Sequence, residues 1–208
     1  MNEYATVEKE YITTTEVCRS KFICRLAPIS TLDEGLEYVA NVKKQFSDAR
    51  HNCYAIVGLP ESNEFKYSDD GEPSGTAGQP MMGALTKNGL YGVACVVTRY
   101  FGGIKLGAGR LAQTYLKSVV DTITSAEIIN KKQSAVISID LSYGEYKMLN
   151  SLLSNVEHVV IDTQYANSVQ VTLATPIENE LSLSGKITEL TQGRTPTTLD
   201  KKYITYKR

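Results

Sequence analysis

The segment Tyr91–Arg110, YGVACVVTRYFGGIKLGAGR, places an apolar run directly before a glycine-rich stretch. The run Val93–Val97 contains no polar residue, which is typical of a central strand covered on both faces. From Ala108 to Ile123 apolar residues recur at helical spacing, which predicts a helix. The predicted buried side of this helix comprises Ala112, Leu116, Val119, Val120 and Ile123. A central strand that leads through glycines into an amphipathic helix indicates an α+β fold.

The residues before this segment predict one more helix and three more strands. Ser30 and Asp33 have the spacing of a capping box, and apolar residues then recur every three or four positions, so a helix is expected over 31–46. Strands are expected over 21–26, 52–58 and 64–68, the last two forming a hairpin.

The last 75 residues predict a separate domain. The polar segment Asn130–Gln133 is the expected linker, so the domains are expected to cover 1–130 and 134–208. Strands and helices alternate in the order βαββαβ, which is typical of a ferredoxin-like fold. In the second helix, Thr175 is the expected N-cap and Pro176 the first helical residue.

Composition indicates a cytoplasmic protein with reduced cysteines. The formal net charge of -1 excludes binding to nucleic acid through bulk positive charge, although it permits a local basic site. The four cysteines lack the paired C-x-x-C spacing of a zinc site, and two of them, Cys53 and Cys95, are expected in the core. The first residues do not resemble a signal peptide, and no apolar run reaches the length of a membrane helix.

Two segments, Asp69–Pro80 and Thr98–Gly109, combine glycines with charged and hydroxyl residues; together they are named the glycine-rich surface. Glycines allow a backbone to approach a ligand, and the start of a helix attracts anions. A site for an anionic small ligand, for instance a phosphate group, is therefore predicted. The candidate ligand-binding residues are His51, Asp70, Glu72, Ser74, Gly75, Thr76, Gly78, Arg99, Gly102, Gly103, Lys105, Gly107 and Arg110.

Other chemistries receive less support from these residues. Asp69, Asp70 and Glu72 have oxygen ligands suited to a divalent cation, but acids in a turn are more often simply solvated. His51 is a candidate general base, although a structural hydrogen bond is the commoner role of a single histidine. Residues 107–112 match the loose G-x-G-x-x-G/A string, but they lie several residues after the strand and no following strand ends in a ribose-binding acid, so a Rossmann site is not expected. No Walker string occurs, and no cofactor is expected. Tight turns remain an alternative explanation of the glycines.

Four strings in this region resemble the YigZ/IMPACT family. They are Ser20–Ile23, Ala49–Ala55, Asp70–Pro80 and Val97–Gly107. The resemblance implies a first domain of the ribosomal-protein-S-five second-domain type and, as in the bacterial branch, a second domain similar to the RNA-contacting ferredoxin-like domain of elongation factor G. Gly109-Arg110 departs from the family pattern, in which two glycines are expected. The family carries over no catalytic residues.

The resemblance and the residues together favour a binding or regulatory protein linked to translation, with RNA or a ribosome-associated ribonucleoprotein as partner. An enzyme that acts on a phosphorylated or otherwise anionic small molecule is the first alternative. A protein-interaction module is the second.

Overall fold

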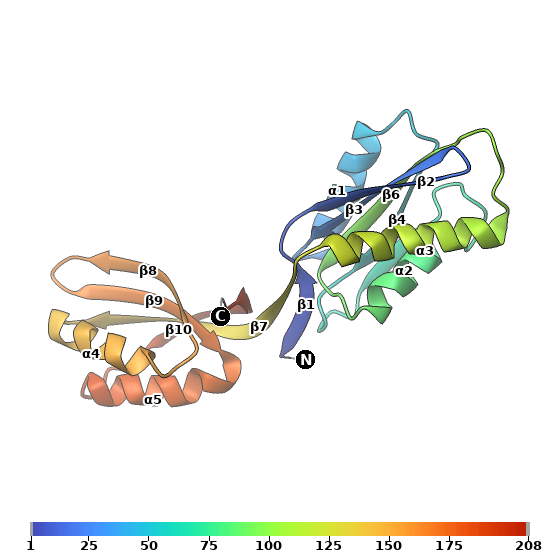
Figure 1. Ribbon diagram of the computed structural model, residues 1–208. Helices are drawn as coiled ribbons and strands as arrows, with labels where there is room; N and C mark the ends of the chain where they lie inside the picture. Colours follow the sequence, from blue (N-terminus) through green and yellow to red (C-terminus); the bar gives the residue numbers. More distant parts are fainter. Residues whose placement is uncertain (1, 207–208) are drawn as a thin grey trace. The chain divides into compact units, whose positions relative to one another are not determined.

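The chain divides into two compact units, one spanning Glu3–Ile129 and the other beginning at Asn130. The structure, a computed structural model, describes residues 2–206 (Figure 1). The boundary falls inside a single strand, β7 (Ile128–Leu141). Each unit contains an antiparallel sheet, so the prediction of a two-domain α+β protein is confirmed.

The prediction of a linker at Asn130–Gln133 is wrong, because these residues lie within a strand. Residues Lys131–Gln133 belong to β7 and pair in antiparallel register with Tyr203–Thr205 of the final strand, β10 (Thr197–Thr205). Polar side chains do not prevent strand formation where both backbone partners are in place, because the pairing is made by N–H and C=O groups that every residue but proline carries.

The sheet of the first unit has the strand order β2-β3-β6-β4-β5. Its strands are β2 (Tyr11–Val17), β3 (Ser20–Pro28), β6 (Val93–Tyr100), β4 (His51–Val57) and β5 (Phe65–Ser68). The predicted central strand is therefore β6, and Val93–Val97 are buried on both faces. A further strand, β1 (Glu3–Val7), forms a parallel bridge from Ala5 to Leu90.

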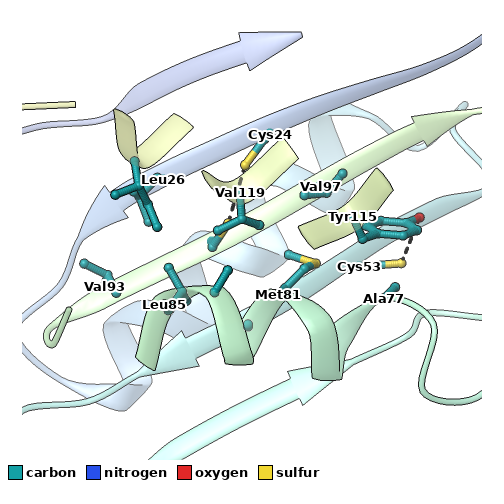
Figure 2. Close-up of a cluster of buried hydrophobic side chains, with 14 of the residues drawn as sticks. Cys24, Leu26, Cys53, Ala77, Met81, Leu85, Val93, Val97, Tyr115 and Val119 are labelled. Carbon is teal, nitrogen blue, oxygen red and sulfur yellow. Dashed lines mark hydrogen bonds between the residues drawn. The ribbon is translucent and has the colours of Figure 1, made fainter. Parts of the chain in front are cut away.

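Helices cover both faces of this sheet. Helix α1 (Leu32–Gln45) packs Val39 and Val42 on one face. Helices α2 (Gly78–Lys87) and α3 (Ala108–Ser125) pack on the other, where Figure 2 shows Met81 and Tyr115 turned toward the sheet. The N-cap of α1 is Thr31, one residue later than predicted, because its hydroxyl accepts the Glu34 N–H.

Two helical predictions need correction. Helix α2 starts inside the segment expected to be irregular; Pro80 is tolerated because the first turn of a helix needs no N–H at that position. In α3, Leu116 and Val120 are exposed, each by 37%. Leu111 and Tyr115 are buried instead, together with hydroxyl residues such as Ser118, whose side chain donates to the carbonyl four residues earlier. A hydroxyl group that donates to a backbone carbonyl of its own helix can be buried, and apolar periodicity does not detect such residues.

The second unit has the predicted order βαββαβ, with α4 (Tyr143–Leu153), β8 (Val159–Tyr165), β9 (Val169–Pro176) and α5 (Glu180–Leu190) between β7 and β10. Strands β9 and β10 both pair with β7, and β8 pairs with β9, in a five-stranded sheet to which β1 also contributes. Both helices contribute to one core, for example through Leu149 and Leu183.

The predicted cap of the last helix is wrong. Thr175 lies in β9, where its hydroxyl donates to the Glu157 carbonyl, and a short 3-10 turn, η1 (Ile177–Asn179), precedes α5. None of the helices within residues 2–206 has the length and apolar character of a membrane-spanning segment.

Candidate functional site

A cavity of about 400 Å³ lies where the two segments of the glycine-rich surface meet in the first unit. It is lined by Arg50–His51, Glu72–Pro73, Arg99, Phe101, Lys105–Ala108 and Leu111. These residues come from the start of β4, the loop after β5, the end of β6 and the start of α3. The register of the sheet explains the meeting, because His51 on β4 lies directly opposite Arg99 on β6. The fold thus brings His51, Glu72, Arg99, Lys105 and Gly107 to one cavity.

A buried ion pair forms one wall. The Arg99 Nη1 group donates to Oε1 of Glu72 over 2.7 Å, and the Tyr115 hydroxyl donates to the same oxygen over 2.8 Å. Both charged side chains are almost completely buried. Burial, aided by the nearby Cys53 and Glu72, raises the pKa of Tyr115 far above its ordinary value, so the hydroxyl stays a donor. Arg99, a candidate ligand-binding residue, thus lines the cavity as a buried member of an ion pair.

One nitrogen of the buried Arg99 guanidinium group has no hydrogen-bond partner among residues 2–206. Nη2 lies 3.5 Å from the Ser20 hydroxyl, and the Phe22 and Phe101 rings lie 5.3 and 5.6 Å from the guanidinium carbon. The Nε atom is the buried side-chain nitrogen without a hydrogen-bond partner in the part of the chain that the structure describes. An unsatisfied buried donor is costly, so it marks a position where an acceptor is expected.

His51 presents a defined ring nitrogen to the cavity. Its Nδ1 lies 2.9 Å from the Asp70 carbonyl oxygen. A carbonyl only accepts, so Nδ1 carries the hydrogen, and Nε2 is the nitrogen that faces Glu72, 3.9 Å from Oε2. Asp70 and Gly71 both have positive φ, 45° and 86°, which turns the loop so that this carbonyl reaches the ring. His51 is therefore held in place by a hydrogen bond at Nδ1 and also lines the cavity.

Asp69 caps helix α2 from a distance. Its Oδ1 accepts the N–H groups of Ala77 and Gly78, each over 2.9 Å, and its Oδ2 accepts the Gly75 N–H over 2.8 Å. Burial raises the pKa of Asp69, but these three backbone donors outweigh it, and the pKa lies below its usual value. The backbone N–H groups at the start of α2 are therefore already bonded to the Asp69 carboxylate and are not available to bind an anion.

The three acidic metal candidates are engaged elsewhere. Asp70 accepts from the Lys43 ammonium and from the Asn52 backbone N–H, and Glu72 belongs to the buried ion pair. Within residues 2–206 no group of three or more His, Cys, Asp or Glu side chains has the arrangement of a metal site. The structure thus does not assemble Asp69, Asp70 and Glu72 around a common point.

Helix α3, in contrast, begins with an open first turn. No side chain caps its start at Gly107 within the described chain, and its first turn contains no acid. The first intrahelical bond runs from the Leu111 N–H to Gly107, so the preceding N–H groups of the first turn point out of the helix. Gly107 and Ala108 line the cavity, beside the exposed side chains of Arg50 and Lys105. Arg110 is exposed but is not part of the cavity wall.

The candidate glycines serve two different purposes. A Cβ at Gly102 would lie 2.0 Å from the Arg19 carbonyl carbon, and one at Gly78 would lie 2.9 Å from the Ser68 backbone, so both allow close packing. Gly75, Gly103 and Gly107 have φ of 75°, 85° and 75°, which favours glycine in each turn. Gly107 alone among these five lines the cavity.

The hydroxyl candidates lie outside the cavity wall. Thr76 is buried and donates to the Pro73 carbonyl over 2.6 Å, and Ser74 is exposed. Sequence reasoning missed Arg50, Phe101 and Tyr115 as contributors. Arg50 adjoins His51 at the start of a strand, and Tyr115 lies one turn after Leu111 on the buried face of α3, but neither signal separates a site from ordinary packing.

Comparison with known proteins identifies the family. Residues 18–123 match the Impact N-terminal domain, and residues 139–194 match a domain of unknown function, DUF1949. The chain belongs to the IMPACT family. Among IMPACT family members, YvyE of Bacillus subtilis is 34% identical over 93% of this chain and 89% of its own length. The Escherichia coli member YigZ is 31% identical over 86% of this chain and 88% of its own.

The two-domain architecture is that of the bacterial IMPACT family members. A crystal structure described as that of an hypothetical protein superposes with a TM-score of 0.68 at 28% identity, covering 96% of this chain and 98% of the other.

Proposed function

We propose that this IMPACT family protein is a cytoplasmic binding protein linked to translation, which engages RNA or a ribonucleoprotein through the cavity. The observation that carries the proposal is the open first turn of α3 in a cavity wall that also contains two exposed cations, Arg50 and Lys105. Backbone N–H groups at a helix start bind phosphate, and flanking cations add attraction. RNA carries phosphate groups, which the backbone N–H groups of this turn and the two cations would bind.

The charge of the whole chain agrees with a local site. A formal net charge of -1 gives no general attraction to RNA, so binding depends on where the cations lie. The fold adds support by resemblance. The first unit is proposed to be of the ribosomal-protein-S-five second-domain type, and the βαββαβ order of the second is that of the RNA-contacting ferredoxin-like domain of elongation factor G.

The test is the salt dependence of binding to a 5′-phosphorylated RNA hairpin. Each phosphate contact adds roughly one to the slope of log affinity against log salt. The double variant Arg50→Ala, Lys105→Ala is expected to bind at least tenfold more weakly and to show a slope smaller by about two. A matched control, Lys44→Ala with Lys66→Ala, removes two exposed cations away from the cavity. Equal affinities of the two double variants would refute the cavity as the RNA site.

Arg99 is unsuitable for this test. Its removal leaves Glu72 buried without its counter-charge, so the loss of folding would be confused with the loss of binding.

A second candidate function is an enzyme that acts on a phosphorylated small molecule. The observation that favours it is the His51 Nε2 group beside Glu72 in a cavity of small-molecule size. A thermal-shift screen of nucleotides and sugar phosphates, with and without magnesium, is expected to show a stabilising ligand, because a ligand that binds the folded state alone raises the unfolding temperature. Turnover of that ligand by the wild type and not by His51→Gln would establish catalysis; stabilisation without turnover would leave binding alone.

A further inference from the structure

The ligand class follows from the composition of the cavity wall, and this inference rests on the proposed function. We infer that the cavity takes one nucleoside monophosphate group, with its terminal phosphate at the start of α3 and its base against Phe101. The shared chemistry has two sources, the phosphorylated end of an RNA and a free nucleotide.

The phosphate end is defined by two independent features. One is the uncapped first turn of α3, whose Ala108 lines the cavity. The other is Arg99, which also lines the cavity, is only 6% exposed and has an Nε group without a partner among residues 2–206. Both features are donors without acceptors in the wall of the same cavity, and a phosphate carries several acceptor oxygens. A bound phosphate would accept from the N–H groups of the open turn and would place acceptor oxygens beside the cavity wall that Arg99 helps to form.

The balance of charge favours a terminal phosphate over an internal one. Arg99 and Glu72 neutralise each other, so Arg50 and Lys105 are the remaining charges of the wall besides His51. A phosphomonoester carries a charge of about -1.5 to -2 near pH 7, whereas each phosphate within an RNA chain carries one negative charge. Two cations therefore match the terminal group.

The apolar part of the wall points to a nucleotide in place of a simple phosphate. Phe101 is 44% exposed, and the Arg99 guanidinium carbon lies over its ring. Pro73, Leu106 and Leu111 extend the apolar surface. Nucleic-acid bases stack favourably on exposed aromatic rings. Inorganic phosphate would leave this surface exposed to water, and a cavity of about 400 Å³ has room for a single nucleotide.

The first experiment compares one RNA hairpin with a 5′-phosphate and the same hairpin with a 5′-hydroxyl, together with free AMP, by calorimetric titration. We expect at least a tenfold preference for the phosphorylated hairpin, because the lost contacts are charge-assisted. Lys105→Ala is expected to reduce this preference, and Lys44→Ala to preserve it. Phe101→Ala is expected to weaken AMP binding while leaving the weak binding of inorganic phosphate unchanged.

The second experiment uses Ala108→Asp. An acid in the first turn of a helix satisfies the free N–H groups and stabilises the fold, so this variant is expected to unfold at the same or a higher temperature than wild type. The same carboxylate occupies the phosphate position, and we expect it to abolish the preference for the 5′-phosphate. A binding loss in a variant that is at least as stable cannot be explained by unfolding.

The outcomes separate the inference from the proposed function. A preference for the 5′-phosphate supports both. Binding of AMP alone, lost in Lys105→Ala, supports the nucleotide site and overturns RNA as the partner. Equal binding of both hairpins with no binding of AMP overturns the inference and leaves RNA binding in place. Absence of binding by both hairpins and AMP overturns both. An Ala108→Asp variant that binds every probe like wild type overturns the start of α3 as the phosphate position.

Discussion

The Tyr115 hydroxyl donates to Oε1 of Glu72 over 2.8 Å, and the hydrogen bond joins the middle of α3 to the loop that carries the cavity wall. The phenol is completely buried, and the Cys53 thiol lies 3.3 Å from its oxygen (Figure 2). Glu72 therefore keeps its position through a contact in the core as well as through Arg99. The loop is held by buried bonds and not by surface contacts alone.

Replacement of Tyr115 by Phe should destabilise the protein by about 1.5–3 kcal/mol, the range for a hydrogen bond to a charged group. Urea unfolding followed by circular dichroism measures the change. Tyr100→Phe is the matched control, because its hydroxyl donates to Asp48 at the surface, and we expect less than about 0.5 kcal/mol there. Equal losses of unfolding free energy in the two variants would show that the buried hydrogen bond stabilises the protein no more than the surface one.

The ion pair between Glu72 and Arg99 predicts strong coupling in a double-mutant cycle. Glu72→Gln and Arg99→Met should each cost about 3–5 kcal/mol, since each leaves one buried charge unpaired. The double variant should be more stable than the sum of the two losses implies, by about 1–3 kcal/mol. Thermal unfolding by calorimetry measures the three variants. Additive losses would mean that each side chain acts through other contacts.

Asp69 predicts a pH dependence of stability. Its pKa is lower in the folded chain than in the unfolded chain, so its contribution is present above the unfolded pKa of about 3.9 and is lost as pH falls through the folded pKa. Asp69→Asn should destabilise the protein by about 1–2 kcal/mol near neutral pH, as the loss of a cap does. The difference between wild type and variant should shrink as the solution is acidified below about pH 4.

Urea unfolding from neutral to acidic pH tests this dependence. Asp121→Asn is the control; its carboxylate pairs with Lys117 at the surface. A constant difference between wild type and Asp69→Asn at all pH values would contradict the cap.

Replacement by alanine should have opposite effects on stability at Gly102 and Gly109, although both lie in the same glycine-rich stretch of the sequence. Gly102→Ala places a methyl group 2.0 Å from the Arg19 backbone and should lower stability by more than about 2 kcal/mol, because backbone has to move. Gly109 is in the first turn of α3 with no heavy atom within 4 Å of an added Cβ. Gly109→Ala should leave stability unchanged or raise it by up to about 1 kcal/mol. Melting temperatures compare the two directly.

The cysteines should differ sharply in reactivity. Cys18 is partly exposed, whereas Cys24, Cys53 and Cys95 are buried. Burial raises the pKa of Cys53 to about 12, and the neighbouring Cys24 thiol together with burial raises the pKa of Cys95. With a disulfide reagent at mildly alkaline pH, one thiol should react quickly and three only as the protein unfolds. A Cys18→Ser variant should lose the fast phase, and a second fast thiol would contradict the buried positions.

The sequence by itself determined the elements with strong local patterns. The unbroken apolar run Val93–Val97 identified the central strand β6, because a strand with no polar face needs cover on both sides. The βαββαβ order of the second unit was equally readable from alternation and helical spacing. The two glycine-rich segments were recognised as parts of one surface, and the cavity does lie between them.

Tertiary structure decided which side chains of that surface face a ligand. Arg99 was a candidate ligand-binding residue, and the register of β6 and β4 together with the loop bearing Glu72 places it in a buried ion pair. Asp69 looked like a solvated acid, but its carboxylate caps helix α2, which starts nine residues later. These roles depend on partners distant along the chain, and local spacing carries no information about such contacts. The open start of α3 became visible only once its lack of a capping partner was known.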